Sequence, residues 1–433
     1  MDVRHNFTTV EIMDRNLKKK VIPLLVELLG KFVPLGPRHI FENDALVSIS
    51  LSRIGVDLPK DHVTEMYQCM RTIYYSGLYN LKISHNFFSS KFIDIIIANC
   101  WKDYKNLDLI SNILDEFHTQ LIKSIETLNI ILPLENIYIK RKPIVLDNCK
   151  LFQMDADNLK YYTDLYDEIL INTGGDEETK RNFRSRFYTN VKSDYGLMNK
   201  ACFRIEVEAQ QEKAVEIAIS YAEMYIHVLT YCAINLSKTT QKFRISLAGQ
   251  YKISRRETLI LRKDNTGISS SSEWIGRTEE LTIDEYKFME MEQSHFNPLI
   301  EIVQKHKRNE VQNILLRAIR DFYNAIVSYD IMSEFINYIM ILENFLSPEN
   351  RKNIKRTISE RVAYLLKDDI DERKELETYI KMLYKIRSDI VHGKEQNIYF
   401  HDLINARDIC VNMISKIVEN SNKWENKGDI CSY

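Results

Sequence analysis

Hydrophobic residues recur at helical spacing through most of residues 1–130. Two stripes show the pattern most clearly, one at residues 24–29 and one at Ile110, Ile113, Leu114, Phe117, Leu121 and Ile122. A repeat of three and four residues predicts one apolar face on a helix. Glycines and prolines at residues 30–37 predict a loop after the first stripe. We therefore expect a helical N-terminal region, to which the pattern assigns no role.

Residues 131–295 change to short strand patterns. Runs rich in apolar and β-branched residues occur at 136–140, 144–146 and 150–154. Asp147 and Asn148 are candidates for a turn between two of these runs. The pattern therefore predicts several short strands at the start of this region.

Further along this region, residues 203–207 and 243–247 alternate apolar and polar side chains, which predicts two half-buried strands. A strand at 258–261 could pair with the second of them. A long helix is expected from about 212 to 232, packed on the sheet. The serine tract at 269–272 is expected to be a loop. Together these elements predict an α+β domain.

Residues 296–433 are predicted to be entirely helical. The expected helices are 297–327, 330–346, 353–367, 371–392 and 399–420. Pro348 stops the second of these, and Gly393 can cap the end of the fourth. The predicted fold class is therefore α+β, mostly α, with a helical N-terminal region, an α+β middle domain and a C-terminal helical bundle.

The composition narrows the classes of protein that fit. The chain has 433 residues, of which 45% are hydrophobic, enough for two or three domains. Its formal net charge is -2, so any contact with nucleic acid must come from a local patch. The seven cysteines contain no CxxC pair, which argues against a zinc ribbon or a disulfide framework. The apolar stretches are too short to span a bilayer, so a cytoplasmic protein without membrane contact is expected.

Common cofactor motifs do not occur in the chain. There is no GxxxxGK[ST], GxGxxG, HExxH or GxSxG sequence. The glycine pair at 174–175 is expected to be a solvated loop before a charged helix over residues 176–186. We therefore expect no metal and no cofactor.

One short segment carries candidate chemistry, because Arg387 is followed five residues later by His392. The pair alone is a weak pattern, since a cationic residue near a helix C-terminus also stabilises the helix dipole. Five residues advance an ideal helix by about 500°, so the two side chains would point about 140° apart. A second copy of the helix, brought in by dimerisation, could complete a site.

Three segments in order resemble the HEPN superfamily, and most closely its ApeA-like branch. They are Leu342-Glu343-Asn344-Phe345-Leu346, Arg361-Val362-Ala363-Tyr364-Leu365-Leu366, and the stretch from Tyr384 to Gly393, with Tyr-x-x-Arg-Ser-x-x-Val-His-Gly spacing. The resemblance covers roughly residues 297–420. It implies a HEPN helical domain at 296–433 that forms a homodimer, with an α+β domain at 131–295 as a sensor or regulatory domain. The region at 1–130 resembles no family that we can name.

The resemblance also implies metal-independent cleavage of RNA by Arg387 and His392. A ribose 2′-hydroxyl attacks the adjacent phosphorus, which requires proton transfer and stabilisation of charge on the phosphoryl oxygens. Histidine exchanges protons near neutral pH, and arginine offers a planar fork to phosphate. DNA lacks the 2′-hydroxyl and should not be cut.

Several residues are candidates for supporting roles. Many family members have Asn, Asp or His directly after the arginine, where this chain has Ser388 followed by Asp389. Glu343 could orient Arg387 through an ion pair or could serve only in helix packing. Basic residues that could follow an RNA backbone are Lys381, Lys385, Arg356 and Arg361. A solvated charged face is an equally good interpretation of this basic set.

The biological context that the resemblance implies is bacterial antiviral defence. There, infection releases RNA cleavage and stops growth, with a phage-derived trigger as a further partner. This step rests on analogy at the level of the fold. The alternative hypothesis is a HEPN module without catalysis, acting as a dimerisation or nucleotide-binding unit.

Overall fold

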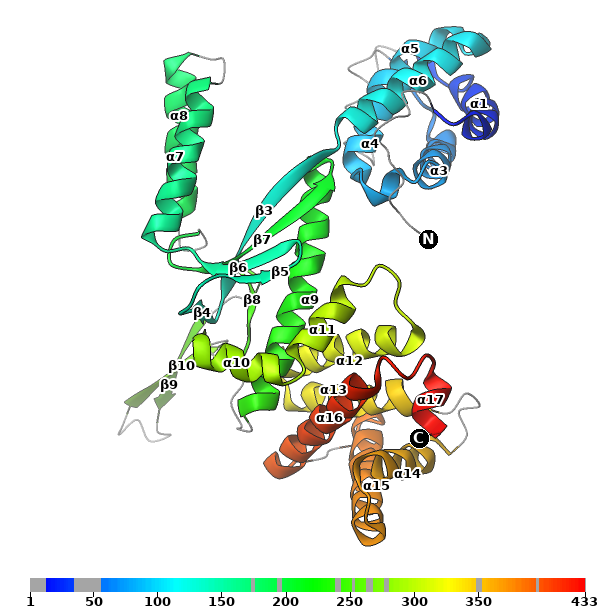
Figure 1. The fold of residues 1–433 in the computed structure, drawn as a ribbon. Helices are drawn as coiled ribbons and strands as arrows, with labels where there is room; N and C mark the ends of the chain where they lie inside the picture. The colour runs from blue at the N-terminus through cyan, green and yellow to red at the C-terminus, as the bar shows by residue number, and fades with distance from the viewer. Residues whose placement is uncertain are drawn as a thin grey trace. The chain divides into compact units, whose positions relative to one another are not determined.

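The computed structural model describes residues 13–34, 56–172, 176–192, 197–237, 243–250, 254–261, 268–275, 280–347, 353–394 and 397–432. Helices make up 69% of the structure and strands 11% (Figure 1), which confirms the predicted α+β, mostly α fold class. The chain divides into two compact units. Unit 1 comprises Met1–Ile130 and Glu206–Ile219, and unit 2 comprises Ile131–Ile205 and Ser220–Tyr433.

Unit 1 is built mainly from helices. They are α1 (Arg15–Leu29), α3 (Lys60–Ser76), η2 (Tyr79–Leu81), α4 (His85–Lys91), the π-helical η3 (Phe92–Ile97), α5 (Ala98–Cys100), η4 (Trp101–Asp103) and α6 (Leu107–Lys123). Two short strands, β1 (Val33–Pro34) and β2 (Val56–Asp57), pair antiparallel. The two predicted apolar stripes lie on α1 and α6, and most of their residues are buried, although Leu24 of the first is exposed. Of the predicted loop at 30–37, residues 35–37 lie outside the described residues.

The sheet that dominates the middle of the chain has the strand order β5-β6-β7-β3-β8. Its strands are β3 (Glu126–Glu135), β5 (Ile144–Leu146), β6 (Cys149–Gln153), β7 (Ala201–Ala209) and β8 (Ser246–Leu247). A separate parallel pair joins β4 (Ile137–Ile139) to β11 (Leu281–Ile283). The hairpin β5–β6 turns at Asp147, whose φ of 49° lies in the left-handed region that Asp tolerates better than most residues. The predicted strands and turn at residues 136–154 are therefore confirmed, and so is the strand at 203–207.

Two predictions for residues 243–275 are wrong. Only Ser246 and Leu247 of the segment 243–247 form a strand, and this strand pairs with β3. The segment 258–261 belongs to β9 (Ser254–Leu261), which pairs antiparallel with β10 (Ile268–Ile275). The serine tract lies within β10 and is not a loop. Backbone pairing with a neighbouring strand, rather than side-chain composition, makes this serine-rich segment extended.

A helical hairpin connects β6 to β7. It consists of α7 (Ala156–Asn172) and α8 (Glu177–Lys192), which lie side by side in Figure 1. Asp155 and Asp176 stand before the two helices and accept backbone hydrogen bonds from Asn158 (2.8 Å) and Thr179 (2.7 Å). The predicted charged helix is confirmed as α8, whereas the sequence pattern did not identify α7.

The longest helix is α9 (Gln211–Ser237), which confirms the predicted helix at 212–232. The ring of Phe203 on β7 packs against Tyr225 on α9 at 5.8 Å, so the helix lies on the sheet as expected. Among the described residues it is the one helix long and apolar enough to cross a membrane by length and composition, and 61% of its most apolar window is buried. A buried core helix of a soluble protein meets the same criteria.

The C-terminal part of unit 2 is helical, as predicted. Its helices are α10 (Glu285–Gln293), α11 (Phe296–Gln304), α12 (Glu310–Val327), α13 (Ile331–Leu346), α14 (Ile354–Leu366), α15 (Ile370–Val391), α16 (Phe400–Asn420) and α17 (Lys427–Ser432). The prediction of a single helix at 297–327 is wrong, because this segment forms two helices, α11 and α12. Asn309 starts α12 with a reciprocal capping box to Gln312, which ends the continuous helix.

Helix α9 also forms part of the core of this bundle. The hydroxyl of Tyr231 lies 2.9 Å from that of Ser415 on α16, and its ring meets Phe322 on α12 edge to face. Tyr323 of α12 donates a 2.8 Å hydrogen bond to the carbonyl of Ile245. The predicted middle and C-terminal regions therefore share a hydrophobic core within unit 2.

His227 of α9 generates a prediction about stability. Its ring packs against that of Tyr323 with centroids 4.4 Å apart, and burial, with a smaller contribution from Arg320, lowers its pKa from 6.5 to about 4. Between these values the unfolded chain binds a proton that the folded chain does not. The free energy of unfolding should therefore decrease as pH falls from 6.5 to 4, by up to about 3 kcal/mol from this group.

His227→Phe should remove that contribution while keeping the aromatic contact. Denaturant titrations of both proteins at several pH values would measure it. Equal slopes of stability against pH for the two proteins would show that His227 is not buried in its neutral form.

Candidate functional site

The predicted site lies at the C-terminal end of α15. His392 is the C-cap residue, and its backbone N–H donates to the carbonyl of Ser388 at 3.0 Å. The next two N–H groups bond back as well, Gly393 to Ile390 at 2.9 Å and Lys394 to Asp389 at 2.9 Å. This pair of bonds is the Schellman motif, and Gly393 has the left-handed φ of 71° that it requires. The predicted glycine cap is confirmed.

The cap determines where His392 lies. Its side chain is exposed, and its backbone is held by a helical hydrogen bond. The helix therefore does not unwind before His392, and only residues after it leave the helical path. The imidazole is presented to solvent at a defined point on the helix end.

Arg387 lies one turn earlier and is bound from a neighbouring helix. Its Nη2 is 3.7 Å from a carboxylate oxygen of Glu343 on α13, and both side chains are about one quarter to one third exposed. The Nε atom of Arg387 is buried and makes no hydrogen bond. The guanidinium thus pairs on one edge with Glu343, and because its Nε is enclosed, only its terminal Nη atoms could meet a phosphate or carboxylate oxygen.

Tyr384 completes this cluster and was not singled out from the sequence as a functional residue. Burial raises the pKa of its hydroxyl, and the nearby Glu343 carboxylate raises it further. The Tyr384 oxygen is buried and lies outside hydrogen-bond geometry to Glu343. The residue stands three positions before Arg387, on the same side of α15, and this spacing was the available signal. Tyr384 therefore remains protonated and packs beneath the arginine.

The three segments that carry the family resemblance are in contact in the structure. Glu343 of the first meets Arg387 of the third. Arg361 of the second donates through Nη1 to the carbonyl of Leu346 at 2.8 Å and contacts the Cys431 sulfur at 3.1 Å. Arg361 therefore ties α14 to the end of α13 and to α17, and it is engaged in contacts within the chain.

Asp389 and Ser388 differ in their environment. Asp389 is buried, and its carboxylate accepts a 2.7 Å hydrogen bond from Lys394. Lys394 holds the pKa of Asp389 below its ordinary value, and Lys385 and His392 contribute in the same direction. The ion pair between Lys394 and Asp389 holds the residues that follow the cap against α15. Ser388 is half-buried and contributes its carbonyl to the cap.

The other predicted basic residues lie on the surface of α14 and α15. Lys381 pairs with Glu377, and Arg356 pairs with Glu360 at 2.6 Å. Lys385 is exposed on α15 between Lys381 and Arg387. Among the described residues, no carboxylate lies within ion-pair distance of Lys385. Along α15 it is the nearest such cation to Arg387.

Arg387 and His392 belong to one helix but do not converge within one copy of the chain. Five residues of regular helix separate their directions by about 140°. No hydrogen bond or ion pair joins the two side chains in the described structure. A site that used both groups on one phosphate would require a second copy, as the sequence spacing predicts. Among described residues, no three His, Cys, Asp or Glu side chains are placed to hold a metal ion.

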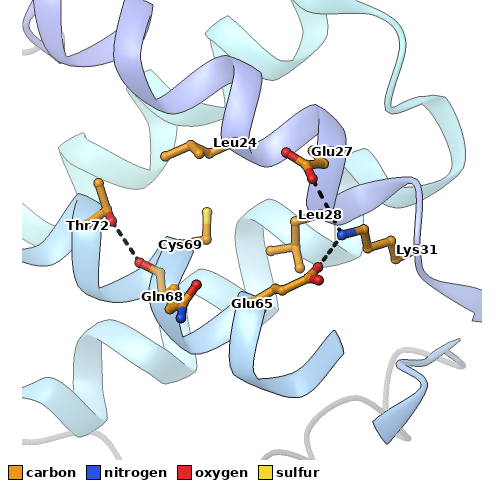
Figure 2. A pocket seen from close by; sticks show the side chains of 8 residues that line it. All are labelled: Leu24, Glu27, Leu28, Lys31, Glu65, Gln68, Cys69 and Thr72. Atoms are coloured by element: carbon orange, nitrogen blue, oxygen red, sulfur yellow. Dashed lines mark hydrogen bonds and ion pairs between the residues drawn. The ribbon is translucent and has the colours of Figure 1, made fainter. Parts of the chain in front are cut away.

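A separate pocket lies in unit 1, between α1 and α3 (Figure 2). Its volume is about 300 Å³, and Leu24, Leu28 and Cys69 form much of its wall. At its rim Lys31 pairs with Glu27 at 3.6 Å and also with Glu65. Burial raises the pKa of the Cys69 thiol to about 12, so this sulfur is protonated and a poor nucleophile. The pocket therefore has none of the reactive groups of the α15 site.

The cap leads to a second prediction. A Cβ added at Gly393 would meet no atom within 4 Å, so Gly393→Ala changes only the backbone preference. Alanine in this left-handed conformation should destabilise the cap by about 1 kcal/mol, so the end of α15 should fray. Amide hydrogen exchange at His392 should accelerate in this variant. Gly393→Asn is the matched control, because Asn adopts this conformation more readily, and it should exchange nearly as slowly as the wild type. Equal exchange in the Ala variant would show that the cap does not hold His392.

Contacts through Glu343, Arg361 and Arg387 link the three segments. No family model, curated protein or solved structure matches this chain.

Proposed function

We propose that the chain is a metal-independent endoribonuclease of HEPN type, with its site at the end of α15. The observation that carries the proposal is the placement of Arg387 and His392. Arg387 is partly exposed and pairs with Glu343, and His392 is exposed on a defined helix cap. The pair combines a cation suited to phosphate with an imidazole that can donate or accept a proton.

The chemistry assigns a role to each residue. His392 exchanges a proton with the ribose 2′-hydroxyl or the leaving 5′-oxygen. Arg387 binds the phosphoryl oxygens, on which charge develops as the 2′-oxygen attacks phosphorus. Bond formation from the 2′-oxygen and loss of the 5′-oxygen leave a 2′,3′-cyclic phosphate. Glu343 and Tyr384 position the guanidinium, and Lys385 follows the RNA backbone.

A homodimer through the C-terminal bundle is part of this proposal. Because the two side chains diverge on one helix, two copies of α15 must face each other for an arginine and a histidine to reach one phosphate. The surface of α13 beside Glu343 supports such a contact. Met340, three residues before Glu343, and Met332 are 40% and 42% exposed, which leaves apolar area available for a second copy.

The proposed biological setting is bacterial antiviral defence in the cytoplasm. A phage-derived trigger would act through the sheet region or unit 1 and release RNA cleavage. The alternative function, a catalytically inactive HEPN module for dimerisation or nucleotide binding, is supported by the ion pair of Arg387 with Glu343, which has a structural role whether or not RNA is cut.

The central prediction concerns the two site residues. Arg387→Ala and His392→Ala should each reduce cleavage of cellular RNA by about 10²- to 10⁴-fold in buffer containing EDTA. Both side chains lie outside the apolar core, so unfolding free energies should change by about 1 kcal/mol or less. The assay measures the rate of RNA loss and the 2′,3′-cyclic phosphate ends.

Two controls accompany this assay. His401→Ala removes another exposed histidine, on α16, and should leave the rate unchanged. Single-stranded DNA of the same sequence should remain uncut. If both site variants kept the wild-type rate, or if wild-type protein cut no RNA while forming a dimer, the binding-module function would replace the nuclease.

Glu343 can be tested separately as a positioning residue. Glu343→Gln keeps the shape but removes the charge that orients Arg387. Cleavage should fall about 10-fold, with the larger effect on kcat, because the guanidinium is less well aligned in the transition state. An unchanged kcat would restrict Glu343 to helix packing.

A further inference from the structure

The hairpin of α7 and α8 exposes an unusual amount of apolar surface. On α7, Tyr161, Leu165 and Ile169 are 61%, 40% and 54% exposed, and on α8 Phe183 is 51% exposed. Within the described part of α7, Thr163 is the one buried side chain. Two helices with so little buried between them lack the packed layer that normally stabilises an amphipathic helix.

These side chains lie on one face of the hairpin. Residues 161, 165 and 169 are four apart and form a stripe along α7. Tyr166 stacks on Phe187 at 3.9 Å with nearly parallel rings, and its hydroxyl donates to the carbonyl of Phe183 at 3.4 Å. Ile169 is one turn from Tyr166, and Phe183 is one turn from Phe187. The stacked pair therefore connects the two exposed sets into a single apolar face.

The two helices carry opposite charge. Helix α7 has four carboxylates and one lysine, a net charge of −3, whereas α8 has five basic residues and two glutamates, a net charge of +3. Within the hairpin this complementarity is already used, because Arg184 binds Asp167 at 2.7 Å. At the edges of the apolar face, Glu168 and Arg186 are exposed. A partner that also presents one acidic and one basic helix would match this pattern.

We propose that the α7–α8 hairpin binds the same hairpin of a second copy of the chain, forming an intermolecular four-helix bundle. In a twofold arrangement, α7 of each copy lies along α8 of the other, so apolar faces meet and opposite charges are opposed. RNA fits this surface less well, because the exposed face is apolar and the two helices together have no net charge. The contact is independent of the nuclease site and of the bundle contact proposed above.

The test uses the full chain in sedimentation velocity over a concentration series, in which assembly through the hairpin is a separate association step from any dimer formed through the bundle. Leu165→Glu combined with Ile169→Glu should weaken this association at least about 100-fold, because four carboxylates would enter an apolar interface. The matched control is Ile171→Glu. Ile171 is 71% exposed but lies two residues from Ile169, about 200° around α7, outside the apolar face. This variant should associate like the wild type.

Charge exchange provides a second variant set that leaves the apolar face intact. Glu168→Lys and Arg186→Glu should each weaken association about 5- to 10-fold at low salt, and the double variant should restore it, because the partner copy carries the exchanged charges. Circular dichroism would check that each variant keeps its helices.

Three outcomes would overturn the proposal. The first is a wild-type chain whose association is unaffected by the double glutamate variant. The second is equal weakening by Ile171→Glu. The third is association that disappears when the protein is treated with a ribonuclease, which would identify bound RNA in place of a second hairpin as the link. Rescue by the double charge variant, with the control unaffected, would establish the contact.

Discussion

The burial of α9 is the constraint on which unit 2 depends. From Tyr221 onward this helix is apolar on nearly all sides, and a helix of that kind needs cover in every direction. The sheet covers it through Phe203, and the bundle covers it through Phe322 and the hydroxyl of Ser415. The sheet and the bundle are therefore halves of one core. Removing either would expose the rings of Tyr225 or Tyr231 to water.

Much of the fold follows from local periodicity in the sequence. The bounds of α13 to α16 and of β5 agree with expectation to within a few residues, because their apolar spacing, prolines and glycines act within each segment. The failures all involve interactions that the spacing of apolar residues does not encode. The break before α12 comes from the capping box of Asn309, and the serine strand β10 exists because β9 pairs with it. Helix α7 was missed because its apolar residues face outward as well as inward.

The site was predictable to a similar degree. The motif placed Arg387 and His392 on one helix end, and the ion pair with Glu343 was one of two roles considered for that carboxylate. Tyr384 and Lys394 were not identified. The buried hydroxyl of Tyr384 follows from how α15 packs on its neighbours, and the link from Lys394 to Asp389 depends on the path of the chain after Gly393. Arg361, expected at an RNA surface, instead bonds to a backbone carbonyl, which basic composition alone does not reveal.

The Schellman cap has a consequence for how this chain can diverge. The hydrogen bonds that hold His392 are accepted by the backbone carbonyls of Ser388, Asp389 and Ile390. They therefore do not depend directly on the side chains in that turn. Val391 is 53% exposed, so this position can accept many residues without moving the imidazole. In this turn, only Gly393 and the ion pair between Lys394 and Asp389 are required by the cap. Distant relatives should therefore share a sparse signature of a few spaced residues, with little overall identity.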